Sequence, residues 1–401
     1  MDMRQTTVEL LKTIETEKEQ YVSIAKEIWN HPEVAFTEVT AAKLLTDCLK
    51  QHGFEVEFPY AGMDTAFRAV YRRGTGGGTF AFAAEYDALA GIGHACGHNT
   101  SGVASVAGAV ATKKYMEDHD QAGTIIVLGT PGEEGGGGKV LMLRNARCLE
   151  GVDAVMMAHA SGAISKADGG STGIRRYDVE FFGKAAHAAG APERGLNALD
   201  AQVLLYNAIG LYRQQMSRKG IIHGVIFEGG EAVNVIPDHT RSRFYIRSVE
   251  DKVIEEIYGR FCDMVKGAAL MTGTTYKIQE FSVAYRPRRP NTVLNNLYYE
   301  GLEALGVPHG GEPAEGRGSS DFGDFSQVAP GIHPYFSINE NFATATVPGH
   351  SEALKACANS DFGYAQMLKA GAVLGGCALK VISDPAVREA IWADFIARGK
   401  K

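Results

Sequence analysis

The sequence lacks the features that mark secreted, membrane-spanning and nucleic-acid-binding proteins. Its first 30 residues carry charges throughout and contain no apolar signal core. No stretch approaches the roughly 20 consecutive apolar residues that span a bilayer. The net charge of −7 provides no broad basic surface for nucleic acid. These absences predict a cytoplasmic protein that binds neither membranes nor nucleic acid.

Cysteine is scarce, with six residues scattered through 401 and no spacing typical of a disulfide framework. In a chain without a secretion signal, these cysteines are expected to be reduced thiols. Hydrophobic residues make up 45% and charged residues 22%, which excludes a disordered or collagen-like chain. A globular chain of this length exceeds the usual size of one hydrophobic core, so we expect two domains.

The N-terminal part has the pattern of a doubly wound, mainly parallel α/β sheet. A helix over 7–29 is followed by β-type runs, which then alternate with helices. The GTGGG segment (74–78) between two of these runs is interpreted as a hairpin turn. The predicted strands cover 54–58, 66–72, 79–86, 124–130 and 153–159, and the helices between them cover 100–117 and 138–147.

The middle of the chain follows a different order. It reads β-α-β-β-α-β, which folds as a ferredoxin-like sheet of four strands with two helices on one face. We therefore predict a smaller domain at 173–285, inserted into a larger domain made of 1–172 and 286–401. The predicted elements are strands over 174–183, 221–228, 239–248 and 275–285 and helices over 195–213 and 250–271.

The strongest local signal is EYDALAGIGHACGHN (85–99), which follows an apolar run and precedes a helix of small residues. In an open α/β sheet, ligands bind beyond the carboxyl ends of the strands, where this segment is expected. Cys96 and His98 are two residues apart, so both can point to one side of an extended loop. A thiolate and an imidazole suit a borderline divalent metal. The alternative is a glycine-rich loop with an incidental cysteine and histidine.

A second signal, GTPGEEGGGG (129–138), also follows an apolar strand. Two adjacent carboxylates are costly unless a positive charge lies beside them, and a metal supplies that charge. Glu134 is then the ligand, while Glu133 takes the proton from a water. The alternative is a solvated acidic turn. A phosphate-binding loop is excluded because the GxxxxGK[ST] pattern is missing.

Two further histidines are candidate ligands. His159 ends a third apolar run, and His350 lies in TVPGHSE (346–352). Either histidine alone is most simply a polar residue at the end of an element. Three successive strands, however, deliver Cys/His, Glu/Glu and His to the same edge of the sheet. Five ligands exceed one four-coordinate structural site and would fit two ions that share ligands.

Together these motifs resemble the M20 metallopeptidase and amidohydrolase family, in its aminoacylase-like branch. That branch includes aminobenzoyl-glutamate hydrolase subunits, hippurate and auxin-conjugate hydrolases, and dipeptidases of the M20-domain-2 type. The resemblance extends over nearly the whole chain, through DALAGIGHACGHN, GTPGEEGGGGK, GKAAHAAGAP, NVIPD and GSSDFGD.

The resemblance implies a hydrolase with one or two divalent ions per chain, Mn²⁺ or Zn²⁺, with Co²⁺ or Ni²⁺ as alternatives. It assigns Glu133 as the general base, and Asp87 is predicted to be a further catalytic residue. The implied metal ligands are Cys96, His98, Glu134, His159 and His350.

The resemblance also implies that the inserted domain is a lid or dimerisation domain, so we expect a homodimer or a higher homo-oligomer. His187 then corresponds to a lid histidine that reaches a neighbouring subunit's site and polarises the scissile carbonyl. Asn234 corresponds to a substrate contact. Arg286 is our choice to hold a substrate carboxylate, with Arg175, Arg176 and Arg288 as other candidates.

Two positions depart from the family pattern. Thr100 and Ser101 follow GHN, where relatives often carry a larger apolar residue. Ala160 and Ser161 follow the histidine of the third motif, where many relatives have proline. Both positions are expected to border the pocket, so they bear on which substrate is bound.

The predicted reaction is hydrolysis of the amide bond of N-acyl or N-aroyl amino acids, or of dipeptides, that carry a free carboxylate. A water activated by the metal adds to the carbonyl, with Glu133 as base. Two alternatives stay open. One is hydrolytic deamination of an aminoaryl carboxylate at the same site, and the other is a non-catalytic binding or regulatory member of the fold.

Overall fold

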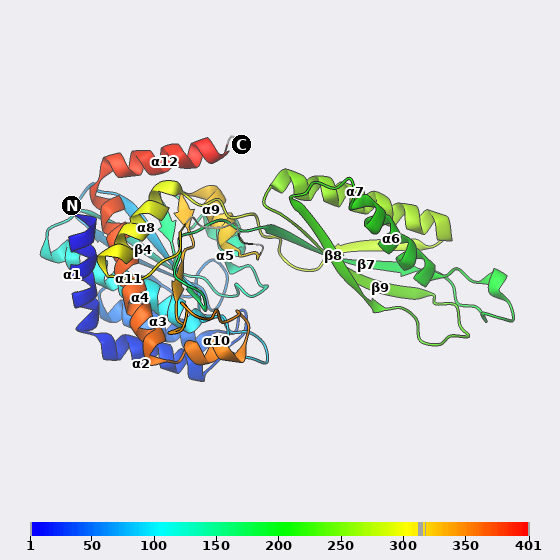
Figure 1. Ribbon diagram of the computed structural model, residues 1–401, viewed down its shortest axis with the longest axis horizontal. Helices are drawn as coiled ribbons and strands as arrows, with labels where there is room; N and C mark the ends of the chain where they lie inside the picture. The colour runs from blue at the N-terminus through cyan, green and yellow to red at the C-terminus, as the bar shows by residue number, and fades with distance from the viewer. Residues whose placement is uncertain (1, 312–315, 317, 400–401) are drawn as a thin grey trace. The chain divides into compact units, whose positions relative to one another are not determined.

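The computed structural model describes residues 2–311, 316 and 318–399, which divide into two compact units (Figure 1). Unit 1 comprises Met1–Gly170, Arg289–Gly316 and Asp321–Lys401. Unit 2 comprises Ser171–Arg288 and Arg317–Ser320. In sequence, unit 2 is therefore an insertion within unit 1.

Unit 1 is built on a sheet of six strands in the order β1-β2-β4-β3-β5-β11. Strand β3 runs parallel to both of its neighbours, and β5 runs parallel to β11, whereas β1-β2 and β2-β4 are antiparallel. The prediction of a mainly parallel sheet is confirmed. The strands are β1 (Glu55–Glu57), β2 (Phe67–Arg73), β3 (Thr79–Ala84), β4 (Gly123–Gly129), β5 (Ala154–Met156) and β11 (Gly331–Ile332).

Two local expectations in this unit were wrong. GTGGG does not close a hairpin, because β4 lies between β2 and β3. The apolar strand β3 is buried on both faces, which favours a central position with parallel neighbours. The predicted helix over 7–29 is two helices, α1 (Met3–Glu15) and α2 (Lys18–Asn30), because the chain turns at Thr16 and Glu17.

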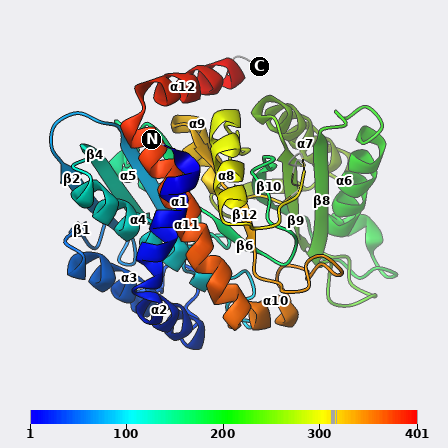
Figure 2. The same cartoon turned by 60° about the vertical axis from the view of Figure 1, so that its left-hand side comes forward.

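Helices cover both faces of the unit 1 sheet, as side-chain alternation requires. Phe80 and Phe82 of β3 pack into a core with α1, α2, α4 and α11, while Ala81 and Ala83 face a second core with α5 and α9. Figures 1 and 2 show α1, α4 and α11 side by side. The unit 1 helices not yet given are α3 (Val39–Gln51), α4 (His98–Asp118), α5 (Gly138–Ala146), α8 (Thr292–Ala304), α9 (Phe322–Val328), α10 (Glu352–Cys357), α11 (Asp361–Ser383) and α12 (Pro385–Gly399).

Small residues allow α4 and α11 to approach closely. A Cβ atom at Gly108 would lie 2.6 Å from the backbone oxygen of Gly371, so a larger residue would separate the two helices. By length and composition α11 could cross a membrane, but 83% of its most apolar window is buried inside unit 1. The core helix of a globular domain passes the same test.

A two-stranded parallel sheet extends this framework toward the candidate site. It consists of β6 (His159–Ser161) and β12 (Tyr335–Ser337). The predicted strand over 153–159 is thus divided: β5 ends at Met156, and His159 opens β6. This break places His159 just beyond the carboxyl end of β5.

Unit 2 has the predicted β-α-β-β-α-β order. Its four strands are antiparallel in the order β10-β7-β9-β8, and apolar residues of one sheet face form a core with α6 and α7. The elements are β7 (Gly173–Phe182), the short 3-10 helix η1 (Pro192–Arg194), α6 (Ala198–Tyr212), β8 (Gly220–Glu228), β9 (His239–Ser248), α7 (Asp251–Thr272) and β10 (Thr275–Glu280).

Candidate metal centre

Three adjacent strands deliver the candidate residues to one edge of the unit 1 sheet. The loop after β3 carries Cys96 and leads into α4, whose first residue is His98. The loop after β4 carries Glu133 and Glu134, and His159 follows β5. Because β3, β4 and β5 run in the same direction, their carboxyl ends meet at one edge.

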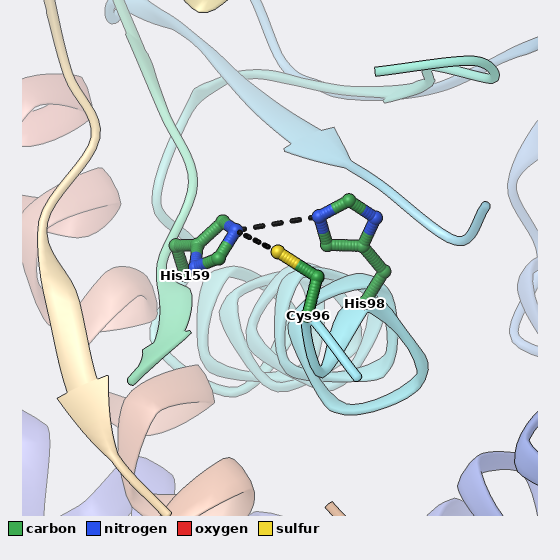
Figure 3. Close-up of side chains that lie close together, drawn as sticks. All are labelled: Cys96, His98 and His159. Carbon is green, nitrogen blue, oxygen red and sulfur yellow. Dashed lines mark hydrogen bonds between the residues drawn. The ribbon is translucent and has the colours of Figure 1, made fainter. Parts of the chain in front are cut away.

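Cys96, His98 and His159 form the first group of donors (Figure 3). The Cys96 Sγ lies 3.5 Å from the His159 Nε2, and the His98 Nε2 lies 3.3 Å from the same nitrogen. In a tetrahedral site with metal–nitrogen bonds of about 2.0–2.1 Å and metal–sulfur bonds of about 2.3 Å, neighbouring donors lie roughly 3.3–3.6 Å apart. The observed spacing therefore fits a metal ion between these side chains.

The second nitrogen of each imidazole fixes which atom faces the centre. The His98 Nδ1 lies 3.0 Å from both the Oδ1 and the backbone oxygen of Asp87, and the His159 Nδ1 lies 2.6 Å from the Ala160 oxygen. These oxygens accept hydrogen bonds, so each Nδ1 carries the hydrogen and each Nε2 presents a lone pair. Two lone pairs 3.3 Å apart repel each other unless a cation lies between them.

The electrostatics of these two histidines agree with that arrangement. Burial opposes a charge on His98, but Cys96 and Asp87 together raise its pKa well above the ordinary value. Burial and the neighbouring His98 lower the pKa of His159 to about 4. The pair thus attracts one positive charge, a proton or a metal ion, and His159 stays neutral as a ligand must.

A second group of donors consists of Cys96, Glu134 and His350. The His350 Nε2 lies 3.3 Å from the Glu134 Oε1. His350 has a positive φ of 57°, and α10 begins two residues later, at Glu352. Since Cys96 belongs to both groups, its sulfur could be shared by two ions, as in sites with paired metals. All five sequence-predicted ligands are therefore brought together.

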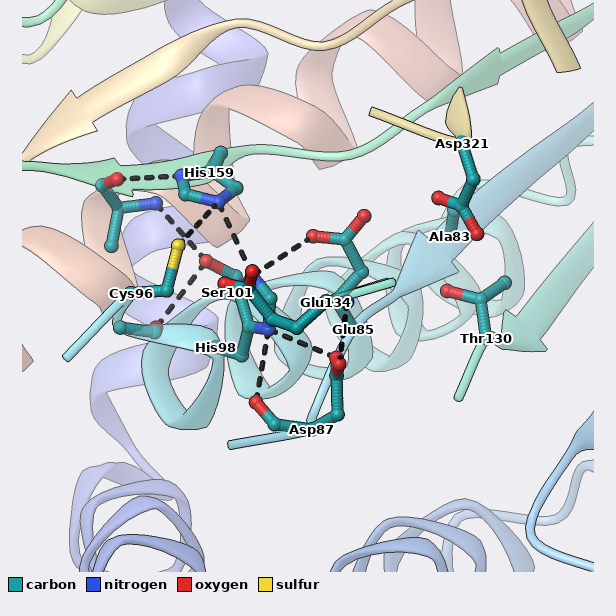
Figure 4. Close-up of polar contacts among 12 residues, drawn as sticks. Ala83, Glu85, Asp87, Cys96, His98, Ser101, Thr130, Glu134, His159 and Asp321 are labelled. Atoms are coloured by element: carbon teal, nitrogen blue, oxygen red, sulfur yellow. Dashed lines mark hydrogen bonds and ion pairs between the residues drawn. The ribbon is translucent and has the colours of Figure 1, made fainter. Parts of the chain in front are cut away.

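Glu133 lies next to these donors, grouped with His98 and Glu134. Burial raises its pKa well above the ordinary value, and the carboxylates of Glu85 and Glu134 raise it further. This shift favours the protonated form, and a nearby cation would favour the carboxylate that a general base requires. Asp87 lies behind the centre: its Oδ2 accepts a hydrogen bond of 2.8 Å from the Glu134 backbone nitrogen, so it orients a histidine and a loop (Figure 4).

Beside the ligands lies a buried charged cluster. Sequence reasoning placed Asp321 in the GSSDFGD motif but did not identify its partners Glu85 and Lys139. The Lys139 ammonium lies 2.6 Å from both the Glu85 Oε1 and the Asp321 Oδ1, and all three side chains are fully buried. Burial would raise the pKa of Glu85, but Lys139 lowers it below the ordinary value. Burial raises the pKa of Asp321 to about 6. Glu85 directly follows a buried strand, the same signal that singled out His159, and could have been found by it.

His333 was also missed. It follows β11, and its ring stacks on that of His159 with the centroids 5.0 Å apart. A ring nitrogen of His333, one of His159 and a carboxylate oxygen of Glu85 lie within 4.8 Å of one another. A histidine at the end of a short, distant strand gave little signal in the sequence, because β11 has only two residues.

The two departures from the family pattern contact each other. The Ala160 backbone nitrogen donates a hydrogen bond of 3.0 Å to the Ser101 hydroxyl. A proline at position 160 would have no N–H to donate. The two departures therefore belong together: Ala160 has a buried N–H that needs an acceptor, and the Ser101 hydroxyl is that acceptor.

The remaining predicted residues lie in unit 2. The His187 Nδ1 accepts hydrogen bonds from the backbone nitrogens of Ala189 and Gly190, and the Asn234 backbone carbonyl accepts one from Ala188, so the two segments lie together. The Arg286 guanidinium lies 2.8 Å from the Asp251 carboxylate. Arg175 is paired in the same way with Glu255, and Arg176 donates to the Val283 carbonyl.

Comparisons with known proteins agree with this geometry. Residues 69–370 match the model of peptidase family M20/M25/M40. The chain is 35% identical to the Xaa-Arg dipeptidase of Mus musculus, over 97% of this chain and 93% of that protein. It is 34% identical to a p-aminobenzoyl-glutamate hydrolase component of Escherichia coli, over 74% of this chain and 64% of that protein.

Solved structures share the fold. A Bacillus subtilis dinuclear metal-binding peptidase of the M20 family superposes with a TM-score of 0.69 at 18% identity, covering 92% of this chain and 99% of that one. An aminobenzoyl-glutamate utilization protein from Klebsiella pneumoniae gives a TM-score of 0.71 at 19% identity, covering 94% and 100%.

Proposed function

We propose that this chain, which belongs to peptidase family M20/M25/M40, cleaves dipeptides or N-acyl or N-aroyl amino acids that carry a free carboxylate. At the coarser level, it is a metal-binding hydrolase of amide bonds. The proposal concerns the substrate class, the ion and the residues that act.

One observation carries the proposal. Lone pairs of a thiol, imidazoles and a carboxylate converge from segments far apart in the sequence, with Glu133 beside them. This donor set suits Zn²⁺ or Mn²⁺, with Co²⁺ or Ni²⁺ as alternatives, and one or two ions per chain. The ligands would be Cys96, His98, Glu134, His159 and His350.

Bound divalent ions polarise a carbonyl and make water a nucleophile at neutral pH. The steps that belong to this chain are proton transfers and orientation. Glu133 accepts a proton from the attacking water and returns it to the leaving nitrogen as the C–N bond breaks. Asp87 keeps the His98 ring in the tautomer that directs Nε2 to the centre.

The substrate class rests on the relatives. Among them are a dipeptidase of Xaa-Arg substrates and a component of a p-aminobenzoyl-glutamate hydrolase, and such substrates end in an amino acid with a free carboxylate. The roles of His187 at the scissile carbonyl and of Asn234 at the substrate remain predictions. Arg286 is a weaker candidate for the carboxylate, because Asp251 already pairs with its charge.

A substrate panel tests this function. Dipeptides with C-terminal arginine, p-aminobenzoyl-glutamate, N-acyl amino acids and aminoaryl acids are incubated with the protein before and after chelation, with Mn²⁺, Zn²⁺ or Co²⁺ added back. We expect release of a free amino acid that stops on chelation and returns with metal. Ammonia without an amino acid would favour the deaminase instead. No turnover with any of them, in protein that holds metal, would favour a binding protein.

Two features of the biological setting also remain predictions. A homodimer or higher homo-oligomer through unit 2 and a cytoplasmic location are both consistent with an amide hydrolase that acts on small molecules.

A further inference from the structure

We propose that Glu85 is a further ligand of the ion held by Cys96, His98 and His159, and that Lys139 is the residue that positions its carboxylate. The inference rests on the proposed metal dependence and extends it to a residue outside the predicted ligand set. Glu85 lies directly after β3, at the same edge of the sheet as the other donors.

Lys139 fixes one half of the Glu85 carboxylate. Its ammonium, carried by the first turn of α5, lies 2.6 Å from the Glu85 Oε1 and 2.6 Å from the Asp321 Oδ1. The Lys139 backbone nitrogen also donates to the Asp321 Oδ2, at 3.0 Å. With all three side chains fully buried, the carboxylate of Glu85 cannot rotate without breaking an ion pair in the core.

The other half of the carboxylate points into the metal centre. The Glu85 Oε2 is buried, receives no hydrogen bond from the residues that the structure describes, and lies 3.5 Å from the His98 Nε2. That nitrogen presents a lone pair, because the His98 hydrogen is on Nδ1, beside Asp87. With His98 neutral, as a metal ligand must be, this oxygen and this nitrogen both accept, so they attract each other only through a cation that both of them bind.

The distance between Glu85 and His98 is that of two donors to one ion. Three contacts link the donor atoms, at 3.5 Å for Cys96–His159, 3.3 Å for His98–His159 and 3.5 Å for Glu85–His98. These values fall in the range of roughly 3.3–3.6 Å expected between ligands of a tetrahedral ion. A carboxylate oxygen of Glu85 and a ring nitrogen of His159 also lie within 4.8 Å of one another.

A simpler role would be to balance the charge of Lys139. Asp321 alone supplies a carboxylate to that ammonium, at the same 2.6 Å. A second carboxylate leaves the cluster with excess negative charge, which is costly in a buried location unless another cation lies nearby. The metal ion supplies that cation, and Glu85 then connects the ion to Lys139.

The direct test is a crystal structure of the wild-type protein loaded with Zn²⁺ or Mn²⁺, with the ions located by anomalous scattering. We expect a Glu85 oxygen at about 2.0–2.2 Å from the ion bound by His98 and His159. An ion seated on those histidines with both Glu85 oxygens beyond about 3 Å would overturn the inference, because such a distance exceeds any metal–oxygen bond. This arm requires no variant, so a folding defect cannot obscure it.

A second test compares Glu85→Ala with Asp153→Ala as a matched control. Asp153 contacts the opposite end of the same strand, where its carboxylate accepts a hydrogen bond of 2.8 Å from the Thr79 nitrogen. We expect the visible absorption spectrum of the Co²⁺-loaded protein to change in Glu85→Ala and to match the wild type in the control. A folded Glu85→Ala protein with an unchanged Co²⁺ spectrum would contradict direct ligation.

Neither readout depends on substrate turnover, so the two proposals fail separately. If Glu85 binds the metal but the protein hydrolyses no amide, the proposed function is contradicted and this inference is not. If the protein hydrolyses amides but Glu85 does not contact the ion, only this inference is contradicted.

Discussion

The two units place their charged residues in opposite ways. In unit 1, carboxylates and imidazoles are buried at the end of a sheet, and Lys139 is surrounded by more negative groups than it can balance. In unit 2, the carboxylate of Asp178 lies 2.6 Å from both Arg241 and Arg243, on partly exposed strands. One region has unbalanced charge in its interior, and the other pairs its charges near the surface.

The difference indicates where the chemistry lies. Buried negative charge destabilises a fold unless a cation binds beside it. A buried cluster of carboxylates is therefore typical of a metal or catalytic site. Ion pairs near the surface contribute little to stability and perturb little chemistry. Two carboxyl groups illustrate this contrast, because burial raises the pKa of Glu38 to about 7 and hydrogen bonds from Arg243 and Arg241 lower that of Asp178.

The largest effect is expected at the base in unit 1. Glu133→Gln should lower kcat by about 10²–10⁴-fold, because the amide cannot accept the proton from water. Metal content, measured by elemental analysis, should stay at the wild-type level. Glu150→Gln, an exposed acidic residue of the same unit, serves as the control. Wild-type turnover in Glu133→Gln would remove it from the mechanism.

A smaller effect is expected from a residue of unit 2. His187→Ala should lower kcat by about 10²–10³-fold if the histidine stabilises charge on the carbonyl oxygen, as loss of one such donor does in other enzymes. Metal binding should not change. His223→Ala serves as the control, because His223 is an exposed histidine of the same unit, and it should leave kcat unchanged. Equal kcat values for the two variants would show that His187 takes no part in catalysis.

Glu38→Gln tests how a buried carboxyl group of unit 1 affects stability. The Glu38 carboxyl accepts hydrogen bonds from the Gly132 nitrogen and the Thr65 hydroxyl, and burial raises its pKa from 4.5 to about 7. The folded state therefore binds this proton more tightly, and the wild type loses stability as pH rises from about 4.5 through about 7. Relative to the wild type, the glutamine variant should gain roughly 2–3 kcal/mol between about pH 5 and pH 8.

The measurement is denaturant unfolding of metal-free protein at several pH values. A difference between Glu38→Gln and the wild type that is constant with pH would show that Glu38 titrates normally in the folded chain.

The smallest effect is expected at the paired carboxylate of unit 2. Asp178→Asn should lower the free energy of unfolding by up to about 1 kcal/mol at neutral pH, since the pairs are partly exposed. The pKa of Asp178 is lowered, so its contribution is present above pH 3.8 and is lost as pH falls through the folded value. Thermal unfolding at about pH 7 and about pH 3 measures this, with the exposed Asp263→Asn as control. If Asp178→Asn loses more stability at about pH 3 than at about pH 7, the pKa of Asp178 is not lowered by folding.

Much of the architecture was readable from sequence. The strand predicted over 174–183 is β7 (Gly173–Phe182), and burial alternates along its second half. The order of elements predicted the four-stranded sheet of unit 2. The turn at Thr16 and the position of β4 between β2 and β3 were missed, because periodicity identifies elements but does not identify the partners of a strand.

What the sequence determined by itself is the list of donors. Cysteine, histidine and glutamate follow apolar runs, and parallel strands must end at a common edge, so a metal centre could be inferred from spacing alone. Tertiary structure decided which atoms face each other. Glu85 and Lys139 are 54 positions apart, and only folding brings the ammonium to one oxygen and leaves the other 3.5 Å from His98. Distance in sequence carries no information about such contacts, because side-chain packing, not chain order, sets them.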